Sequence, residues 1–129
     1  MRKKHAIHNE EACDYLLASN KFNDWVVTTA FYSALHFVQH EIFPISEIGE
    51  TFSDLNSYYA KVLKKKNKGL SKHSATIQLV NSKLPKCSSY YRWLYDACMN
   101  SRYTNYSVSN KKAKLARDYL RVLRNHLTK

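Results

Sequence analysis

The sequence lacks the turn-forming residues that an all-β fold requires. Only two glycines and two prolines occur among its 129 residues, and these residue types make most tight turns. So few of them favour a small number of long helices, and the length is ordinary for one domain with its own hydrophobic core. We therefore expect a single all-α domain over residues 1–129.

Cysteine is scarce as well. Cys13, Cys87 and Cys98 are odd in number and form no Cys-x-x-Cys pair, so the pattern indicates neither a disulfide framework nor a cysteine-based zinc site. Glu10 and Glu11 stand where a secretion signal would need its apolar core. We interpret the thiols as small apolar side chains in a reduced, cytoplasmic protein. A catalytic Cys–His pair is the less favoured alternative, because no spacing supports it.

Acidic residues are few relative to basic ones. The chain has 10 Asp and Glu against 21 Lys and Arg, a net charge of +11. This charge attracts phosphate-rich partners, but it also suits a merely solubilising surface, because net charge governs encounter and not fold. Composition alone therefore leaves nucleic acid or nucleotide binding and a bland basic surface equally open.

No hydrophobic run is long enough to span a bilayer, so we expect no membrane association. Residues 24–43 nevertheless form a helical pattern that is apolar on nearly every side, which is typical of the central helix of a bundle. Asn23 or Asp24 is expected to cap this helix, and Pro44 to end it. A short turn at Asn20 and Lys21 predicts an antiparallel hairpin with the preceding helix.

Four more helices have clear patterns, and together they predict an up-and-down helical bundle of about five helices. They cover about residues 9–19, 71–84, 88–103 and 110–127. Ile77, Val80 and Leu84 are expected on the inner side of the helix over residues 71–84. The pattern weakens over residues 44–70, where apolar residues at helical spacing follow a possible cap at Ser53.

Basic residues gather in two places. In the last helix a basic stripe lies roughly 110° from the apolar stripe, at the rim of the bundle, where it can line a groove against a neighbouring helix or a second subunit. This stripe consists of Lys114, Arg117, Arg121 and Arg124. The weak segment ends in a lysine cluster that includes Lys64, Lys65 and Lys66.

Short motifs in both halves resemble those of HEPN-superfamily domains. They are Phe22-x-x-Trp25, Ala30-Phe31-Tyr32-Ser33-Ala34-Leu35-His36, Lys72-His73, Tyr91-x-x-Leu94 and Ser101-Arg102-Tyr103-x-x-Tyr106. The resemblance implies an all-α bundle, commonly a homodimer, with an RNA- or nucleotide-linked role in defence, toxin–antitoxin or stress systems. It also implies that Arg102 matches the arginine of a metal-independent ribonuclease motif.

The histidine of that motif is missing. No histidine follows Arg102 before the last helix. A second match, Arg121 with His126, lies within the last helix, where five residues separate the two side chains by about 140°. The usual Arg/His pair is therefore incomplete, which counts against ribonuclease activity.

Three functions remain open. The first is binding of RNA or a nucleotide, without cofactor or metal, through Arg102, the basic stripe and the lysine cluster. The second is a ribonuclease that uses Arg102 with His36 or His73, in a cleft that Tyr32, Tyr103 and Tyr106 help to line. The third is a protein-interaction module that recruits, for example, a nucleotidyltransferase-type partner.

His36 and His40 stand four residues apart, a spacing that can hold a metal on a helix. Two ligands do not make a zinc site, and no third ligand has the right spacing nearby. We therefore expect no metal, and we expect His36 to be hydrogen-bonded to a tyrosine or a backbone carbonyl.

Overall fold

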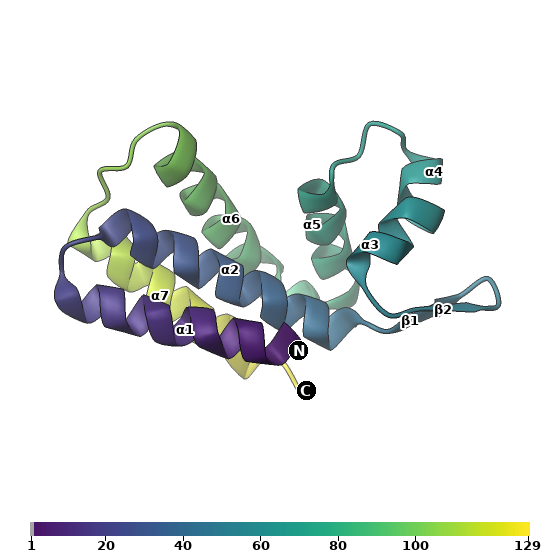
Figure 1. Ribbon diagram of the computed structural model, residues 1–129, viewed down its shortest axis with the longest axis horizontal. Helices are drawn as coiled ribbons and strands as arrows, with labels where there is room; N and C mark the ends of the chain where they lie inside the picture. The colour runs from purple at the N-terminus through teal and green to yellow at the C-terminus, as the bar shows by residue number, and fades with distance from the viewer. Residues whose placement is uncertain (1) are drawn as a thin grey trace.

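The helix α2 (Asn23–Ile42) lies at the centre of the computed structural model, which describes residues 2–129 (Figure 1). Its apolar side chains are buried on several sides, as a helix of this composition requires. The neighbours that cover it are α1 (Arg2–Ser19), α6 (Ser88–Tyr103) and α7 (Asn110–Asn125), with α5 (Lys72–Lys83) near its C-terminal half. The prediction of an all-α helical fold is confirmed, apart from one small hairpin.

The hairpin of α1 and α2 has the predicted antiparallel form, but α1 begins at Arg2 and not near residue 9. The additional turns form because they pack on α2. Ala6 is fully buried, and the buried Ser33 hydroxyl donates to the Ala6 carbonyl at 2.8 Å. Asn20 turns the chain with a φ of 57°, a conformation that asparagine tolerates.

The prediction that Asn23 or Asp24 caps α2 is wrong. Phe22 occupies the cap position without a side-chain hydrogen bond. The Asn23 amide instead donates to the Val108 carbonyl at 3.0 Å and to the Asn110 side chain at 2.7 Å. Asn23 therefore ties the start of α2 to the start of α7.

The weak segment contains an element that the sequence pattern did not reveal. Strands β1 (Ile45–Glu47) and β2 (Glu50–Phe52) form an antiparallel hairpin, with Ile45 opposite Phe52. Ile48 and Gly49 make the turn, both at positive φ. Strands of three residues are too short to show an alternating pattern.

A distorted helix follows the hairpin. It comprises α3 (Leu55–Tyr58), the π-helical turn η1 (Tyr59–Leu63) and α4 (Lys64–Lys66). Its cap is Asp54, whose Oδ1 accepts from the Ser57 amide at 2.9 Å, and not Ser53 as expected.

The remaining helices agree well with the sequence patterns. Ser71 caps α5 and Ser109 caps α7, and the short 3-10 turn η2 (Pro85–Cys87) leads into α6. The inner side of α5 is corrected: Val80 is buried, whereas Ile77 and Leu84 are only half-buried. The other buried residues of α5 are Ala75, Thr76 and Leu79.

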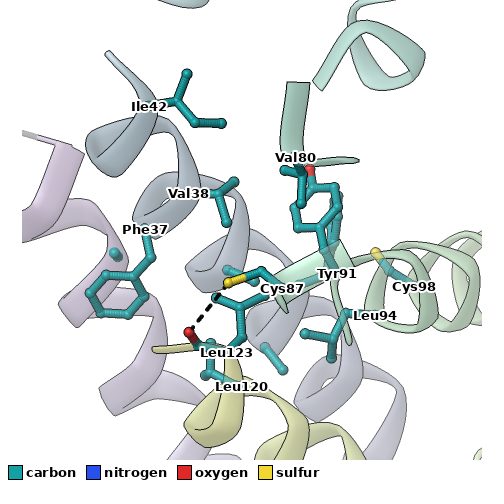
Figure 2. Packing of buried hydrophobic residues seen from close by; sticks show 14 of the residues in the cluster. Phe37, Val38, Ile42, Val80, Cys87, Tyr91, Leu94, Cys98, Leu120 and Leu123 are labelled. Carbon is teal, nitrogen blue, oxygen red and sulfur yellow. Dashed lines mark hydrogen bonds between the residues drawn. The ribbon is translucent and has the colours of Figure 1, made fainter. Parts of the chain in front are cut away.

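Side chains from α2, α5, α6 and α7 meet in one apolar core (Figure 2). The Cys87 thiol donates to the Leu123 carbonyl at 3.7 Å, next to Leu120. Leu120 and Leu123 are both fully buried. Within residues 2–129, no helix has the length and the apolar character that crossing a membrane requires.

Replacement of Leu120 by alanine should leave a cavity at the centre of this core. We expect Leu120→Ala to lower the free energy of unfolding by about 2 to 5 kcal/mol, measured by urea denaturation. Lys111→Ala, an exposed change in the same helix, should alter it by less than about 0.5 kcal/mol. Equal losses in the two variants would contradict the packing described above.

All three thiols are free and buried. Burial raises the pKa of Cys13 to about 11 and also raises the pKa of Cys87 and of Cys98. Because the thiolate is the reactive form, iodoacetamide at about pH 8 should label the native protein far more slowly than the urea-unfolded chain. Mass spectrometry would measure this, and rapid labelling of one native thiol would instead support a reactive cysteine.

Candidate functional site

The last turn of α6 presents Arg102 on the surface, where two tyrosines hold its guanidinium. Arg102 Nη1 donates to Tyr32 Oη of α2 at 2.7 Å. The guanidinium carbon lies 5.1 Å from the ring centroid of Tyr103 and 6.0 Å from that of Tyr32, within the range of a cation–π interaction. The structure thus brings together three of the residues that the sequence placed in one cleft.

A histidine from α5 stands on the same side of α2. The ring centroid of His73 lies 5.5 Å from that of Tyr95 and 6.1 Å from that of Phe31. Burial lowers the pKa of His73, and the charge of Arg102 lowers it further. His73 is therefore a neutral imidazole at pH 7, placed within the electrostatic influence of Arg102.

Arg102 lines a pocket of about 210 Å³ between α2 and the end of α6. Trp25 and Tyr106 line it too, with exposed fractions of 54% and 78%, and Tyr103 beside it is 72% exposed. Single exposed aromatic side chains are common, but a group of them on one surface often marks a binding site. Asp24 contributes the one carboxylate of the lining, and Thr28 and Ser101 complete it.

Sequence reasoning expected Tyr106 in the pocket but did not assign Trp25 a binding role. Trp25 appeared only as part of a motif and of an amphipathic face. Its exposure could not be foreseen, because it depends on which side of α2 the end of α6 leaves uncovered.

His36 does not join this site. It lines a different pocket, with Arg2 and His5 of α1 and with Ser53 and Asp54. Its Nδ1 is buried and has no hydrogen-bond partner within residues 2–129, so the expected bond to a tyrosine or a carbonyl is wrong. Of the two histidines in the ribonuclease alternative, only His73 can therefore still act together with Arg102.

Two arginines of the basic stripe of α7, Arg117 and Arg124, face α1 and bind carboxylates there. Arg117, with a side chain only 12% exposed, pairs with Asp14 and with Glu10. Arg124 pairs with Glu10 and lies over the Phe37 ring, 4.8 Å from its centroid. Arg117 and Arg124 therefore lie against a neighbouring helix, where acidic side chains of α1 pair with their charges.

The other basic residues of the prediction are exposed. Arg121 pairs with Asp118 on its own helix at 2.8 Å. Lys114 and the three lysines of α4, Lys64, Lys65 and Lys66, form no ion pair in the part of the chain that the structure describes. Their contact with nucleic acid stays a prediction.

Arg102 differs from most arginines of this protein. Four of the six, namely Arg92, Arg117, Arg121 and Arg124, pair with carboxylates. Over residues 2–129, Arg102 and Arg2 have no such partner, and Arg2 donates to the Gln39 side chain. Arg102 is therefore an exposed cation whose charge is not compensated by a carboxylate within ion-pair distance.

Metal binding is not indicated in the described part of the chain. No group of three His, Cys, Asp or Glu side chains in residues 2–129 is arranged so that it could hold a metal ion. His36 and His40 thus have no third ligand there.

No family model matches this chain, and no curated protein or solved structure matches it either. The likeness to HEPN domains therefore stays a prediction from short motifs. The function has to be argued from the residues of the site.

Stability should depend on pH, because the fold lowers the pKa of two partly buried histidines, His36 and His73. Burial and the charges of His5 and Arg2 lower the pKa of His36. Burial and the charge of Arg102 lower the pKa of His73. The folded protein thus binds fewer protons than the unfolded chain below the ordinary histidine pKa of about 6.5. The free energy of unfolding should therefore decrease as the pH falls from about 7 to about 5.

Urea unfolding across this pH range measures the effect. The double variant His36→Gln with His73→Gln should flatten the slope, whereas His8→Gln, an exposed change on α1, should keep it. A double variant with the slope of the unmodified protein would show that neither histidine is held neutral by the fold.

Proposed function

We propose that this protein binds RNA or a nucleotide at the surface around Arg102. The observation that supports the proposal is an arginine without a carboxylate partner, held by Tyr32 and Tyr103 beside the exposed Trp25. A cation and several exposed aromatic rings are the two features that recognition of unpaired nucleotides uses.

The phosphate contact falls to Arg102. Its bond to Tyr32 occupies Nη1 and leaves Nε and Nη2 to donate. A guanidinium binds a phosphate through two parallel hydrogen bonds, and a tyrosine that fixes its orientation lowers the entropic cost of doing so.

The base contact falls to the aromatic side chains. Trp25, Tyr103 and Tyr106 surround the guanidinium, and each exposes more than half of its surface. Stacking of a base on such a ring contributes about 1 to 3 kcal/mol, with little dependence on sequence. An adjoining pocket of about 200 Å³, lined by Lys21, Tyr106 and Ser107 among others, continues the surface toward the start of α2.

The wider proposal comes from the HEPN resemblance. In this proposal the protein forms a homodimer that acts in a defence, toxin–antitoxin or stress system. The exposed lysines of α4 and Lys114 of α7 add long-range attraction for phosphates. The basic residues outnumber the acidic ones two to one, which supports this attraction.

A ribonuclease remains the second candidate, because His73 supplies an imidazole on the side of α2 where Arg102 lies. A neutral imidazole suits a general base, and the guanidinium suits stabilisation of a phosphorane. This candidate requires cleavage without metal. The third candidate, an interaction module, requires neither RNA binding nor cleavage.

Labelled single-stranded RNA in chelator, resolved on native and denaturing gels, tests these candidates. Arg102→Ala should weaken binding about tenfold or more and reduce the salt dependence by about one counterion. The matched control is Arg92→Ala, an exposed arginine of the same helix that pairs with Asp96. Unchanged binding in Arg102→Ala would contradict the proposal.

The denaturing gel separates binding from catalysis. Cleavage that disappears in both Arg102→Ala and His73→Gln would establish the ribonuclease. A shift without cleavage supports binding alone, and the absence of both would favour the interaction module.

A further inference from the structure

Another pocket lies further along α2, between the first turns of α1 and the loop that follows β2. It measures about 350 Å³ and is lined by Arg2, His5, His36, Ser53 and Asp54. None of its lining residues belongs to the Arg102 pocket. Three separate segments thus bring an arginine, two histidines and a hydroxyl to one cavity.

The two histidines face each other with unfilled hydrogen-bonding capacity. Their ring centroids are 5.2 Å apart, in an edge-to-face arrangement. His36 makes no hydrogen bond in the described structure, and its Nδ1 is buried. A buried polar group without a partner is destabilising, so a ligand that accepts a hydrogen bond from this ring would offset part of that cost.

The cations of this pocket repel one another when no anion is present. Burial, the charge of His5 and then that of Arg2 all lower the pKa of His36. A bound anion reverses the sign of this electrostatic effect, because it attracts the protonated imidazoles as well as the guanidinium. Binding of an anion and uptake of a proton by His36 are therefore coupled.

Asp54 is the one carboxylate in the lining, and its side chain caps α3. Its Oδ1 accepts from the Ser57 amide at the start of α3, and this bond lowers the pKa of Asp54. The nearby charge of Arg2 acts in the same direction. Arg2 and Asp54 offset each other in charge, so the further donors of the cavity come from His5 and His36.

We propose that this pocket binds a tetrahedral dianion of the phosphate monoester class, and that binding strengthens as the pH falls. Arg2 supplies the permanent charge and the fork of donors, and the rings of His5 and His36 supply further N–H donors. The site is independent of the RNA-binding surface proposed for Arg102.

Sulfate is the appropriate probe, because it stays a dianion over the pH range in which histidine titrates. Titration at constant ionic strength, at about pH 6 and about pH 8, should give tighter binding at the lower pH. The histidine ring signals in NMR spectra should shift for His5 and His36 in the unmodified protein. Sulfate that shifts neither signal, or that binds equally at both pH values, would overturn the proposal.

Three variants distinguish an anion site from a structural role. His5→Gln and His36→Gln should each weaken sulfate binding at about pH 6 by roughly tenfold, as loss of one charge-assisted hydrogen bond does. His8→Gln is the matched control on α1 and should bind as the unmodified protein does. Asp54→Asn retains a good helix cap but removes a negative charge, so it should strengthen binding.

Weaker binding in Asp54→Asn, or equal losses in His8→Gln and His36→Gln, would contradict the assignment. Arg102→Ala should leave the sulfate affinity unchanged. If Arg102→Ala abolishes sulfate binding, the anion belongs to the Arg102 surface and the second site does not exist.

Discussion

The fold depends on the burial of α2 on almost all sides. A helix with apolar residues around most of its circumference cannot lie on a surface, so other elements must cover each of its faces. Of these, α1 and α7 cover one part, α6 and α5 another, and the ridge that they leave open carries Trp25 and Tyr32. The position of the candidate RNA site follows from this incomplete cover, because a helix end stops where Arg102 can reach back to α2.

The same packing pairs some basic side chains with carboxylates and leaves others unpaired. Glu10, which is almost buried, receives Arg117 and Arg124 from the opposite end of the chain. These pairs join α1 to α7, so that part of the basic stripe serves docking between helices. In the described part of the chain, the positive charge outside such pairs lies on lysines, on Arg2 and on Arg102, and there it is available to a partner.

Prediction from sequence succeeded where a helix has a repeating apolar face. The helices expected over residues 88–103 and 110–127 correspond to α6 and α7, because burial on one side imposes a spacing of three and four residues. It was wrong for the first turns of α1, where Ala6 is buried within a basic stretch that has no apolar period. It was also wrong for residues 45–52, since two strands of three residues leave no period to detect.

The candidate site, like the fold, was predicted from the sequence only in part. The meeting of Tyr32, Arg102 and Tyr103 was expected from motif resemblance, but the separation of His36 from Arg102 was not. His36 lies one turn beyond Tyr32 on the same face of α2. Which neighbouring helix covers that turn depends on packing between helices, and so does the pairing of Glu10 with Arg117. Such contacts link residues far apart in sequence, and no local pattern encodes them.

The burial of the Glu10 pairs has a practical consequence for handling the protein. Salt screens exposed charges within about 10 Å at 0.1 M, whereas partly buried pairs are screened much less. Raising the ionic strength should therefore remove anionic ligands from the lysines and Arg102 before it loosens the contact between α1 and α7. A high-salt wash can yield folded protein free of co-purified nucleic acid.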